Sequence, residues 1–317
     1  MSVNIDLDKN RKQIAHQKKS RGQLSQRTKD HISGYLYISP FFILFGVFGV
    51  FPLIYTAFIS FHDWNILGGK EFIGIDNYAV LFSDPVFWIS IRNTFSIWIL
   101  STLPQLFLAL VLAFILNQAF LKGKEFFRLS IFLPNITSIV AVAIIFSSIF
   151  GEQYGILNYL LSLIGIEPIN WKGSTLATHL AIASMVMWRW TGYNAIIYLA
   201  ALQSISKDLY EAATIDGASK TQQFFHITIP MIRPMIIFTV ILSTIGGLQI
   251  FAEPLMFSGL GGGAMEQGLT ITLYLYEEAF VRDSFGYASS IAWVLFLIIV
   301  LFSLFNLFLT NRIKSAD

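Results

Sequence analysis

Six long runs of apolar residues, separated by shorter polar segments, dominate this chain. They lie roughly at residues 34–61, 93–119, 129–150, 175–203, 234–257 and 285–310. Crossing ~30 Å of hydrocarbon takes about 20 helical residues, and each run reaches that length. The runs are too long and too uniformly apolar for the strands of a membrane barrel, in which polarity alternates. We therefore predict an all-α integral membrane protein with about six transmembrane helices.

The composition agrees with a membrane protein and excludes several other classes. Of 317 residues, 55% are hydrophobic and 13% are charged, whereas a soluble domain has about a quarter charged residues. A net charge of +2 does not suggest nucleic acid as a partner, and the absence of cysteine excludes disulfides and thiolate metal sites. The first apolar run is too long for the core of a cleaved signal peptide, so we interpret it as a retained span.

Lysine and arginine residues predict the orientation. With the N-terminus inside, the segments 1–33, 120–128, 204–233 and 311–317 hold 16 of the 21 basic residues. Because basic residues favour the cytoplasmic side, we place both termini in the cytoplasm. The predicted organisation is a basic cytoplasmic tail (1–33), a six-span membrane domain (34–310) and a second cytoplasmic tail (311–317).

Two of the predicted outer segments have a distinct character. Residues 62–92 contain the turn-forming sequences Asp76-Asn77-Tyr78 and Asp84-Pro85, which predict a turn-rich cap. Residues 258–283 begin with a glycine cluster and become amphipathic over 273–280. We expect this second piece to lie along the outer surface before the last span.

The inner segment 204–233 is a polar, helix-forming insert. Ser206 is placed to cap a first helix, and Gly217 can end that helix in a left-handed conformation. Ser219 and Gln222 form a capping-box pattern that begins a second short helix. The sequence thus predicts a compact helix–turn–helix, with Pro230 and Pro234 at the turn into the fifth span.

An ordinary amphipathic loop lying on the membrane is the alternative for this insert. Such a helix needs lysines on its polar face and bulky apolar residues opposite. Residues 208–218 contain no lysine and several alanines, so this alternative is disfavoured.

The segment 210–230, which contains Glu-Ala-Ala and a glycine six residues after the glutamate, resembles the cytoplasmic signature loop of ABC-importer permeases. The resemblance covers almost the whole chain, and the chain is similar to permeases of the carbohydrate-uptake class with the maltose-type fold. Within that class it looks like the first of two dissimilar permease subunits of lactose, cellobiose and related oligosaccharide importers. It lacks the additional N-terminal spans and the large periplasmic insert of some relatives, so contacts of that insert are not carried over. The matching segments are 35–40, 51–55, 72–78, 92–94, 133–136, 199–205 and 246–254.

The resemblance implies a set of partners. They are a second homologous permease that completes the pore, two copies of an ABC ATPase, an extracellular or periplasmic sugar-binding protein and a sugar. ATP and Mg²⁺ would be held by the ATPase, and this chain would bind no cofactor or metal. The residues expected to couple to the ATPase are Tyr210, Glu211, Ala212, Ala213, Asp216, Gly217, Ala218, Phe224 and Pro230.

Two apolar runs carry polar residues at membrane depth, where charge is costly and usually marks function. The candidate substrate path consists of Trp188, Arg189, Gly192, Tyr193, Asn194, Gln249 and Glu253. Aromatic faces can stack on a sugar ring, while amide and charged groups satisfy its hydroxyls; Trp190 is a further aromatic candidate. We predict that Gln249 and Glu253 share one helix face. Two alternatives stay open: Arg189 and Glu253 form a structural ion pair, or both lie at the outer interface beside a belt of tryptophans.

Other functions receive less support from the sequence. There is no Walker motif and no convincing catalytic cluster for a membrane-embedded glycosyl or acyl transferase, so we expect a transporter subunit and not an enzyme. An ion-coupled secondary carrier would favour internal repeats and acidic relays, and only Glu253 qualifies. A permease for glycerol phosphate would need more basic residues than Arg189 alone. His62, His179 and His226 are scattered, without metal-ligand spacing.

Overall fold

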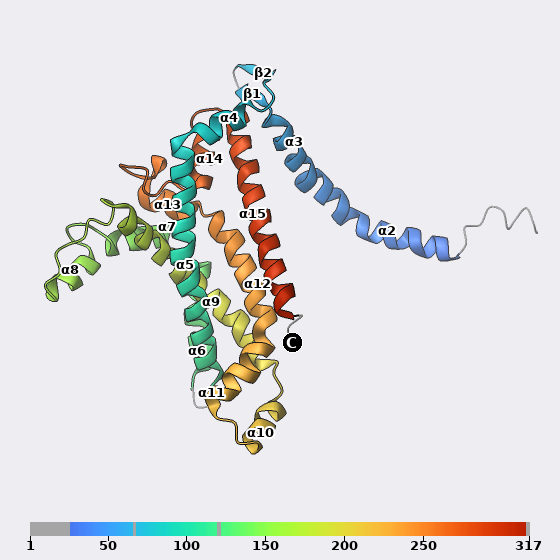
Figure 1. Cartoon of the computed structure of the whole chain (residues 1–317), viewed down its shortest axis with the longest axis vertical. Helices are drawn as coiled ribbons and strands as arrows, with labels where there is room; N and C mark the ends of the chain where they lie inside the picture. Colours follow the sequence, from blue (N-terminus) through green and yellow to red (C-terminus); the bar gives the residue numbers. More distant parts are fainter. Residues whose placement is uncertain (1–25, 66–67, 119–121, 315–317) are drawn as a thin grey trace, which may run out of the picture. The chain divides into compact units, whose positions relative to one another are not determined.

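The computed structural model describes residues 26–65, 68–118 and 122–314, which form two units (Figure 1). The first unit ends at Phe58 and the second begins at Ile59. Most of the predicted N-terminal tail (1–33) and the last three residues of the predicted C-terminal tail (311–317) lie outside the described residues.

The described part of the first unit, residues 26–58, consists of helix without tertiary packing of its own. Helix α2 (Gln26–Phe45) continues through a π turn, η1 (Gly46–Val50), into α3 (Phe51–Ile59). None of the described side chains up to Phe58 is buried, and most are large and apolar. An apolar helix of this length suits a lipid or protein environment and not water.

The second unit begins with a two-stranded hairpin and continues in helices. The hairpin pairs β1 (His62–Asn65) with β2 (Gly69–Phe72) in antiparallel register, with His62 opposite Phe72. The helices that follow are α4 (Asp76–Ser83), α5 (Pro85–Asn117), α6 (Lys124–Ile136), α7 (Ile139–Ile149), α8 (Ile156–Leu163), α9 (Thr175–Gln203), α10 (Lys207–Ile215), α11 (Lys220–Gln223), η2 (Phe224–Thr228), α12 (Ile229–Leu248), α13 (Ala252–Ser258), η3 (Leu260–Gly262), α14 (Ile271–Phe280) and α15 (Phe285–Lys314).

Four helical stretches among the described residues are long and apolar enough to cross a membrane. They are Asp30–Ile59, Pro85–Asn117, Lys220–Leu248 and Phe285–Phe308. The pair α6 and α7 makes a fifth if it is one span, although the two helices are bent by 96°. The predicted run at 129–150 is therefore not one straight helix. The presence of six spans remains a prediction. Helix α9, which was expected to be the fourth span, is long enough to cross a membrane but is not among these stretches.

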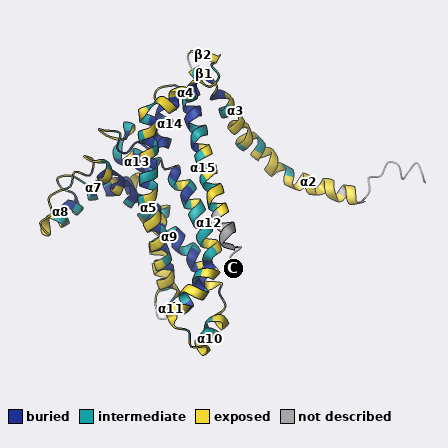
Figure 2. Cartoon of the chain, in the orientation of Figure 1, coloured by how far each residue is buried: buried dark blue, intermediate teal, exposed yellow. Residues whose placement is uncertain are grey.

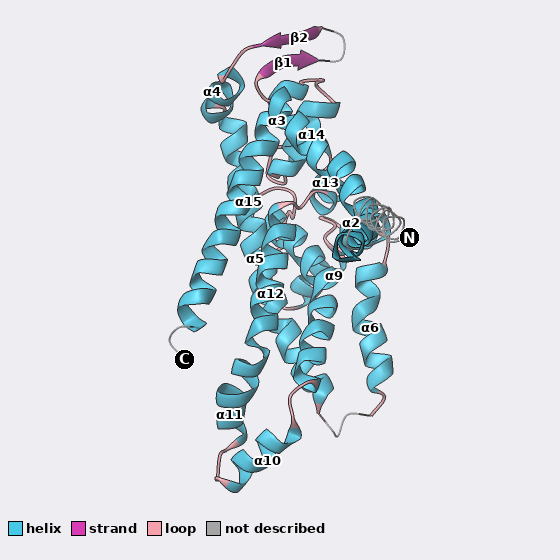
Figure 3. Ribbon diagram, turned by 90° about the vertical axis from the view of Figure 1, so that its right-hand side faces the viewer, coloured by secondary structure: helices cyan, strands magenta, loops and turns pink. Residues whose placement is uncertain are grey.

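Helices α5 and α9 pack along each other and form the centre of the second unit. Small residues permit this approach: Ala109 and Ala113 of α5 and Ala195 of α9 are fully buried. The same cluster takes in Ile232 of α12. The hairpin lies at one end of this unit, whereas α10 and α11 lie at the opposite end (Figures 1 and 3).

Helix α6 approaches α9 unusually closely at Gly192. A Cβ atom at this position would overlap the backbone carbonyl oxygen of Ile131. Only glycine leaves room for this crossing, which holds the first half of the bent pair α6–α7 against the central helix.

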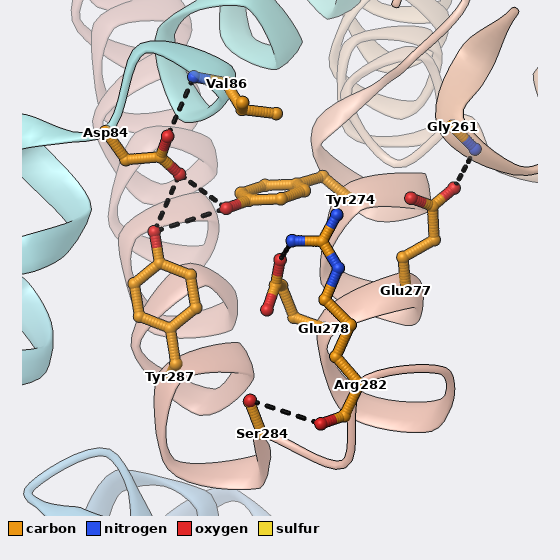
Figure 4. Close-up of polar contacts among 9 residues, drawn as sticks. All are labelled: Asp84, Val86, Gly261, Tyr274, Glu277, Glu278, Arg282, Ser284 and Tyr287. Atoms are coloured by element: carbon orange, nitrogen blue, oxygen red, sulfur yellow. Dashed lines mark hydrogen bonds and ion pairs between the residues drawn. The ribbon is translucent and has the colours of Figure 1, made fainter.

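A polar cluster joins the beginning of α5 to α14 and α15 (Figure 4). Asp84 caps α5 by accepting a hydrogen bond from the Val86 N–H at 2.9 Å. Its other oxygen accepts from the Tyr274 hydroxyl and, at 2.9 Å, from the Tyr287 hydroxyl. Burial raises the pKa of the Tyr274 hydroxyl, so this group remains a donor to the Asp84 carboxylate.

Helix α14 differs from the expected surface helix. Six of its ten residues are buried, among them Glu277 and Glu278. Glu277 accepts a hydrogen bond from the Gly261 N–H, and Glu278 pairs with Arg282 at 2.6 Å. Burial raises the pKa of Glu278, although Arg282 opposes this shift. The amphipathic pattern therefore marks a helix enclosed against α5 and α15 and not one lying on a surface.

The close crossing generates a stability prediction. Replacing Gly192 with alanine should lower the stability of the purified protein by about 1–3 kcal/mol, because the new methyl group must push α6 away from α9. The measurement is the midpoint of thermal unfolding in detergent, for which this corresponds to a fall of a few degrees.

Gly246→Ala is the matched control, since no atom lies within 4 Å of a Cβ at that helical position. Its midpoint should stay level or rise slightly, because alanine favours helix. Equal midpoints for the two variants would contradict the close crossing.

Candidate functional site

The helix–turn–helix at 204–233 is built as its sequence predicts at both helix starts. Ser206 caps α10 by accepting from the Asp208 N–H at 3.2 Å. Ser219 and Gln222 form a complete capping box at the start of α11. These caps satisfy backbone donors that would otherwise lack partners at exposed helix ends.

Gly217 ends α10 in the predicted left-handed conformation, with a φ of 82°. The Ala218 N–H donates to the Ala213 carbonyl at 2.9 Å, and the Gly217 N–H donates to the Thr214 carbonyl at 3.1 Å. This pair of bonds is the Schellman motif, which fixes the angle at which the chain leaves the helix.

Side chains lock the two helices together. The Tyr210 and Thr228 hydroxyls lie 2.9 Å apart, and the Gln223 side-chain amide donates to the Thr214 hydroxyl at 2.9 Å. The Phe224 ring also meets the Phe114 ring of α5 at a centroid distance of 5.4 Å. The insert is therefore a structured unit attached to the central helices.

The entry into α12 differs from the prediction. Residues Lys220–Leu248 form one helical stretch that passes through the π turn η2. Pro230 occupies the first turn of α12 and Pro234 lies inside it, so neither flanks a turn. Pro230 is the second residue after the π turn η2, where the regular i→i−4 hydrogen bonding of the helix is already interrupted.

The predicted coupling residues lie together on this unit. Helix α10 carries no buried residue, and Glu211, Ala212, Asp216 and Gly217 are exposed (Figure 2). Tyr210, Ala213, Ala218 and Phe224 are partly buried, whereas Pro230 is exposed. The exposed acidic and small residues form a surface that a partner can approach closely.

A cavity of about 500 Å³ lies between α5, α9, α12 and α13. Its lining residues are Thr102, Gln105, Val186, Arg189, Trp190, Tyr193, Asn194, Leu242, Ser243, Gly246, Gly247, Gln249, Ile250, Phe251, Ala252 and Glu253. The cavity thus combines apolar walls with a small number of hydrogen-bonding groups, as is typical of sites for small molecules.

Arg189 and Glu253 form an ion pair in this cavity, with Nη1 and Oε1 2.6 Å apart. The two side chains are 16% and 8% exposed, so each charge is largely removed from solvent. Arg189 Nε is buried without a hydrogen-bond partner among the described residues. The pair joins α9 to α13 and also faces the cavity, so the structural ion pair and the candidate site share the same two residues.

The break before α13 separates two residues that we expected on one helix face. Helix α12 ends at Leu248, and Phe251, with φ −133° and ψ −54°, precedes α13. Gln249 therefore lies in the junction and Glu253 in the next helix. Both nevertheless line the cavity, because the chain turns around it.

The candidate path residues on α9 divide between two sides of that helix. Arg189, Tyr193 and Asn194 line the cavity, together with Trp190, whose ring meets that of Tyr193 at 5.7 Å. Trp188 instead packs on Phe146 of α7 at 5.7 Å. Gly192 faces α6 at the close crossing.

Sequence analysis did not identify the two polar lining residues of α5. Thr102 and Gln105 of α5 are 5% and 3% exposed. Their signal was two polar residues three positions apart within an apolar run, which places them on one helix face. The sequence argument relied on charged residues at membrane depth, and Thr102 and Gln105 are uncharged.

The histidines that the structure describes do not form a metal site. His179 is buried, with its ring nitrogens 2.8 Å from Ser96 Oγ and 2.9 Å from the Gln267 carbonyl oxygen. In the part of the chain that the structure describes, no three His, Cys, Asp or Glu side chains are grouped so as to hold a metal ion.

Comparison with known proteins identifies the family. Residues 79–315 match the binding-protein-dependent transport system inner membrane component family. The chain is 38% identical to the lactose transport system permease protein of Rhizobium radiobacter, over 89% of this chain and 95% of that protein. It is 33% identical to the arabinooligosaccharides transport system permease protein of Halalkalibacterium halodurans, over 95% of each.

A solved structure is also similar. A chain of the bacterial alginate ABC transporter, crystallised in complex with an alginate pentasaccharide-bound periplasmic protein, has a TM-score of 0.77 and 26% identity. The match covers 90% of this chain and 96% of that chain. The long helices described above have the length and composition of a multi-pass membrane protein. This chain therefore belongs to the binding-protein-dependent transport system inner membrane components, as a permease of the sugar ABC transporter class.

Proposed function

We propose that this chain forms half of the translocation pore of an ATP-driven importer of di- or oligosaccharides. The observation that carries the proposal is the cavity between α5, α9, α12 and α13. It has two neighbouring aromatic rings, Trp190 and Tyr193, and uncharged hydrogen-bonding groups on several helices. The names of the relatives, which refer to lactose and arabinooligosaccharides, support the same class of cargo.

The cavity lining suits the two kinds of surface that a sugar presents. A pyranose has apolar C–H faces that pack on aromatic rings, and hydroxyls that donate and accept hydrogen bonds. Gln105, Asn194 and Gln249 each offer both a donor and an acceptor at the cavity wall. A volume of about 500 Å³ lies within the usual range for small-molecule sites.

The proposed substrate path on this chain is made by Arg189, Tyr193, Asn194, Gln249 and Glu253, with Trp190 as a stacking residue. Trp188 and Gly192 contribute indirectly, by packing α9 against α7 and α6.

The proposed energy source is a separate ATPase. Two ATPase copies would hold ATP and Mg²⁺, and one would dock on α10 and its flanking turn, while this chain binds no cofactor. A second permease would complete the pore, and an external binding protein would deliver the sugar. ATP binding would favour the outward-open pore and hydrolysis would return it to the inward-open one, a two-state mechanism in which the nucleotide biases one conformation.

The continuous helix from Lys220 to Leu248 supports this coupling scheme. It begins in the proposed docking unit, and its last turns contribute Leu242, Ser243 and Gly246 to the cavity. A movement of the docking unit therefore has a direct mechanical connection to the cavity wall. A phosphate cargo such as glycerol phosphate has less support, because Arg189 is the one basic residue of the lining and its charge is paired.

The stacking role generates a prediction with a matched pair of variants. Trp190→Ala should weaken saccharide binding or raise the KM of uptake by about tenfold, since an aromatic contact is worth roughly 0.5–1.5 kcal/mol beyond its buried area. Trp188→Ala, two residues away and similarly exposed, should have a clearly smaller effect because its ring lies on Phe146. A larger loss of affinity in Trp188→Ala would overturn the assigned cavity wall.

The coupling role generates a second prediction. Glu211→Lys should abolish uptake and reduce co-purification of the ATPase, because the exposed carboxylate is replaced by the opposite charge at the docking surface. Saccharide binding to the cavity should persist in this variant.

Glu152→Lys is the control, since it makes the same charge change at another exposed position. It should retain the ATPase. Normal uptake and normal ATPase recovery in Glu211→Lys would show that α10 is not the docking site.

A further inference from the structure

We infer that the cavity selects uncharged saccharides, and that Glu253 determines this selectivity by neutralising Arg189. The inference rests on the proposed sugar-binding function of the cavity and adds the charge class of the cargo. The comparisons do not decide this point, because the similar solved transporter imports an acidic polysaccharide, alginate.

The cavity lining has no net charge. Arg189 and Glu253 are its two charged members, and the polar residues beside them are threonine, serine, asparagine and glutamine. The ion pair has a direct contact of 2.6 Å between Nη1 and Oε1. An isolated arginine at this depth would attract an anion, whereas a close pair presents a dipole.

Burial makes this neutralisation effective. The Glu253 side chain is 8% exposed and that of Arg189 is 16% exposed, so water screens the two charges weakly. A carboxylate on the cargo that approached Arg189 would also approach Glu253, and the repulsion would offset the attraction. It would in addition lose its hydration without a dedicated positive partner, which is costly.

A neutral saccharide meets neither obstacle. Its hydroxyls can accept hydrogen bonds from the guanidinium and donate to the carboxylate without adding charge. The remaining lining groups, such as Gln105 and Asn194, are also matched to uncharged hydroxyls. Glu253 thus acts through Arg189, as a specificity-determining residue.

The test compares matched neutral and acidic ligands. The full transporter is purified through a tag on this chain and reconstituted in lipid nanodiscs. The probes are cellobiose, lactose and maltotriose, each paired with the uronic acid in which one primary alcohol carbon is oxidised to a carboxylate. Binding is measured by saturation-transfer NMR with competition between the two members of each pair.

The wild type should bind the neutral member of at least one pair about tenfold more tightly than its uronate, or more. Glu253→Gln, which keeps the side-chain size, should shift this ratio toward the uronate by about tenfold or more, because Arg189 then has no counter-charge. The double variant Arg189→Gln/Glu253→Gln should lose that gain, because no positive charge then remains to attract the uronate.

Glu277→Gln is the matched control. Glu277 is buried, as is Glu253, but it lies in α14 outside the cavity lining. Its neutral-to-uronate ratio should equal that of the wild type. A change as large as that of Glu253→Gln would show that the selectivity does not originate in the ion pair.

Several outcomes would overturn the inference. Tighter uronate binding by the wild type would contradict it, as would an unchanged ratio in folded Glu253→Gln. If Glu253→Gln does not fold, the wild-type ratio and the double variant decide, and a double variant that favours the uronate would count against the inference. Absence of binding by every saccharide would refute the proposed sugar cavity itself, whereas binding without discrimination by charge would refute this inference alone.

Discussion

The packing of α5 along α9 is the constraint on which the rest of the second unit depends. Fully buried alanines bring the two helices together, and the other elements attach to α9 through specific contacts. Gly192 leaves room for α6 to pack against α9. The Tyr198 hydroxyl of α9 lies 2.5 Å from the Thr239 hydroxyl of α12. Arg189 binds Glu253 of α13. Because these contacts occur at different levels of α9, the surrounding helices enclose a cavity on one side of it.

The arrangement connects the two candidate functional regions mechanically. One helical stretch leads from α11 to the cavity wall, and Phe224 near its start contacts α5. Side-chain hydrogen bonds hold α10 on the same unit. A partner that moves α10 would therefore move a packed group of helices and not a flexible loop. A rigid connection of this kind can transmit the movement of α10 to the cavity wall.

Local chemistry made much of this structure predictable. The cap at Ser206, the left-handed Gly217 and the capping box at Ser219 each depend on a few adjacent residues, and all three were correctly predicted. The bounds of α9 also agree with the apolar run at 175–203. Such features are set by backbone hydrogen bonding and hydrophobic length, which the sequence displays directly.

Features set by tertiary contacts were not predicted. The hairpin at 62–72 and the 96° bend between α6 and α7 were missed, and the helix break at Gln249 separated two residues expected on one face. At the candidate site, charge and aromaticity indicated Arg189, Tyr193 and Glu253. The contribution of Thr102 and Gln105 depends on how α5 is rotated against α9, which the position of two polar residues within one apolar run does not reveal.

The central claim is that this chain is a pore subunit of a saccharide importer, and uptake in a deletion strain tests it most directly. Uptake of labelled lactose, cellobiose, maltose, raffinose, arabinooligosaccharides and glycerol phosphate is measured before and after complementation with the wild-type gene. The account predicts loss of uptake of one di- or oligosaccharide, or of a closely related group, with recovery on complementation. Undiminished uptake of every saccharide, together with loss of glycerol phosphate uptake, would contradict it.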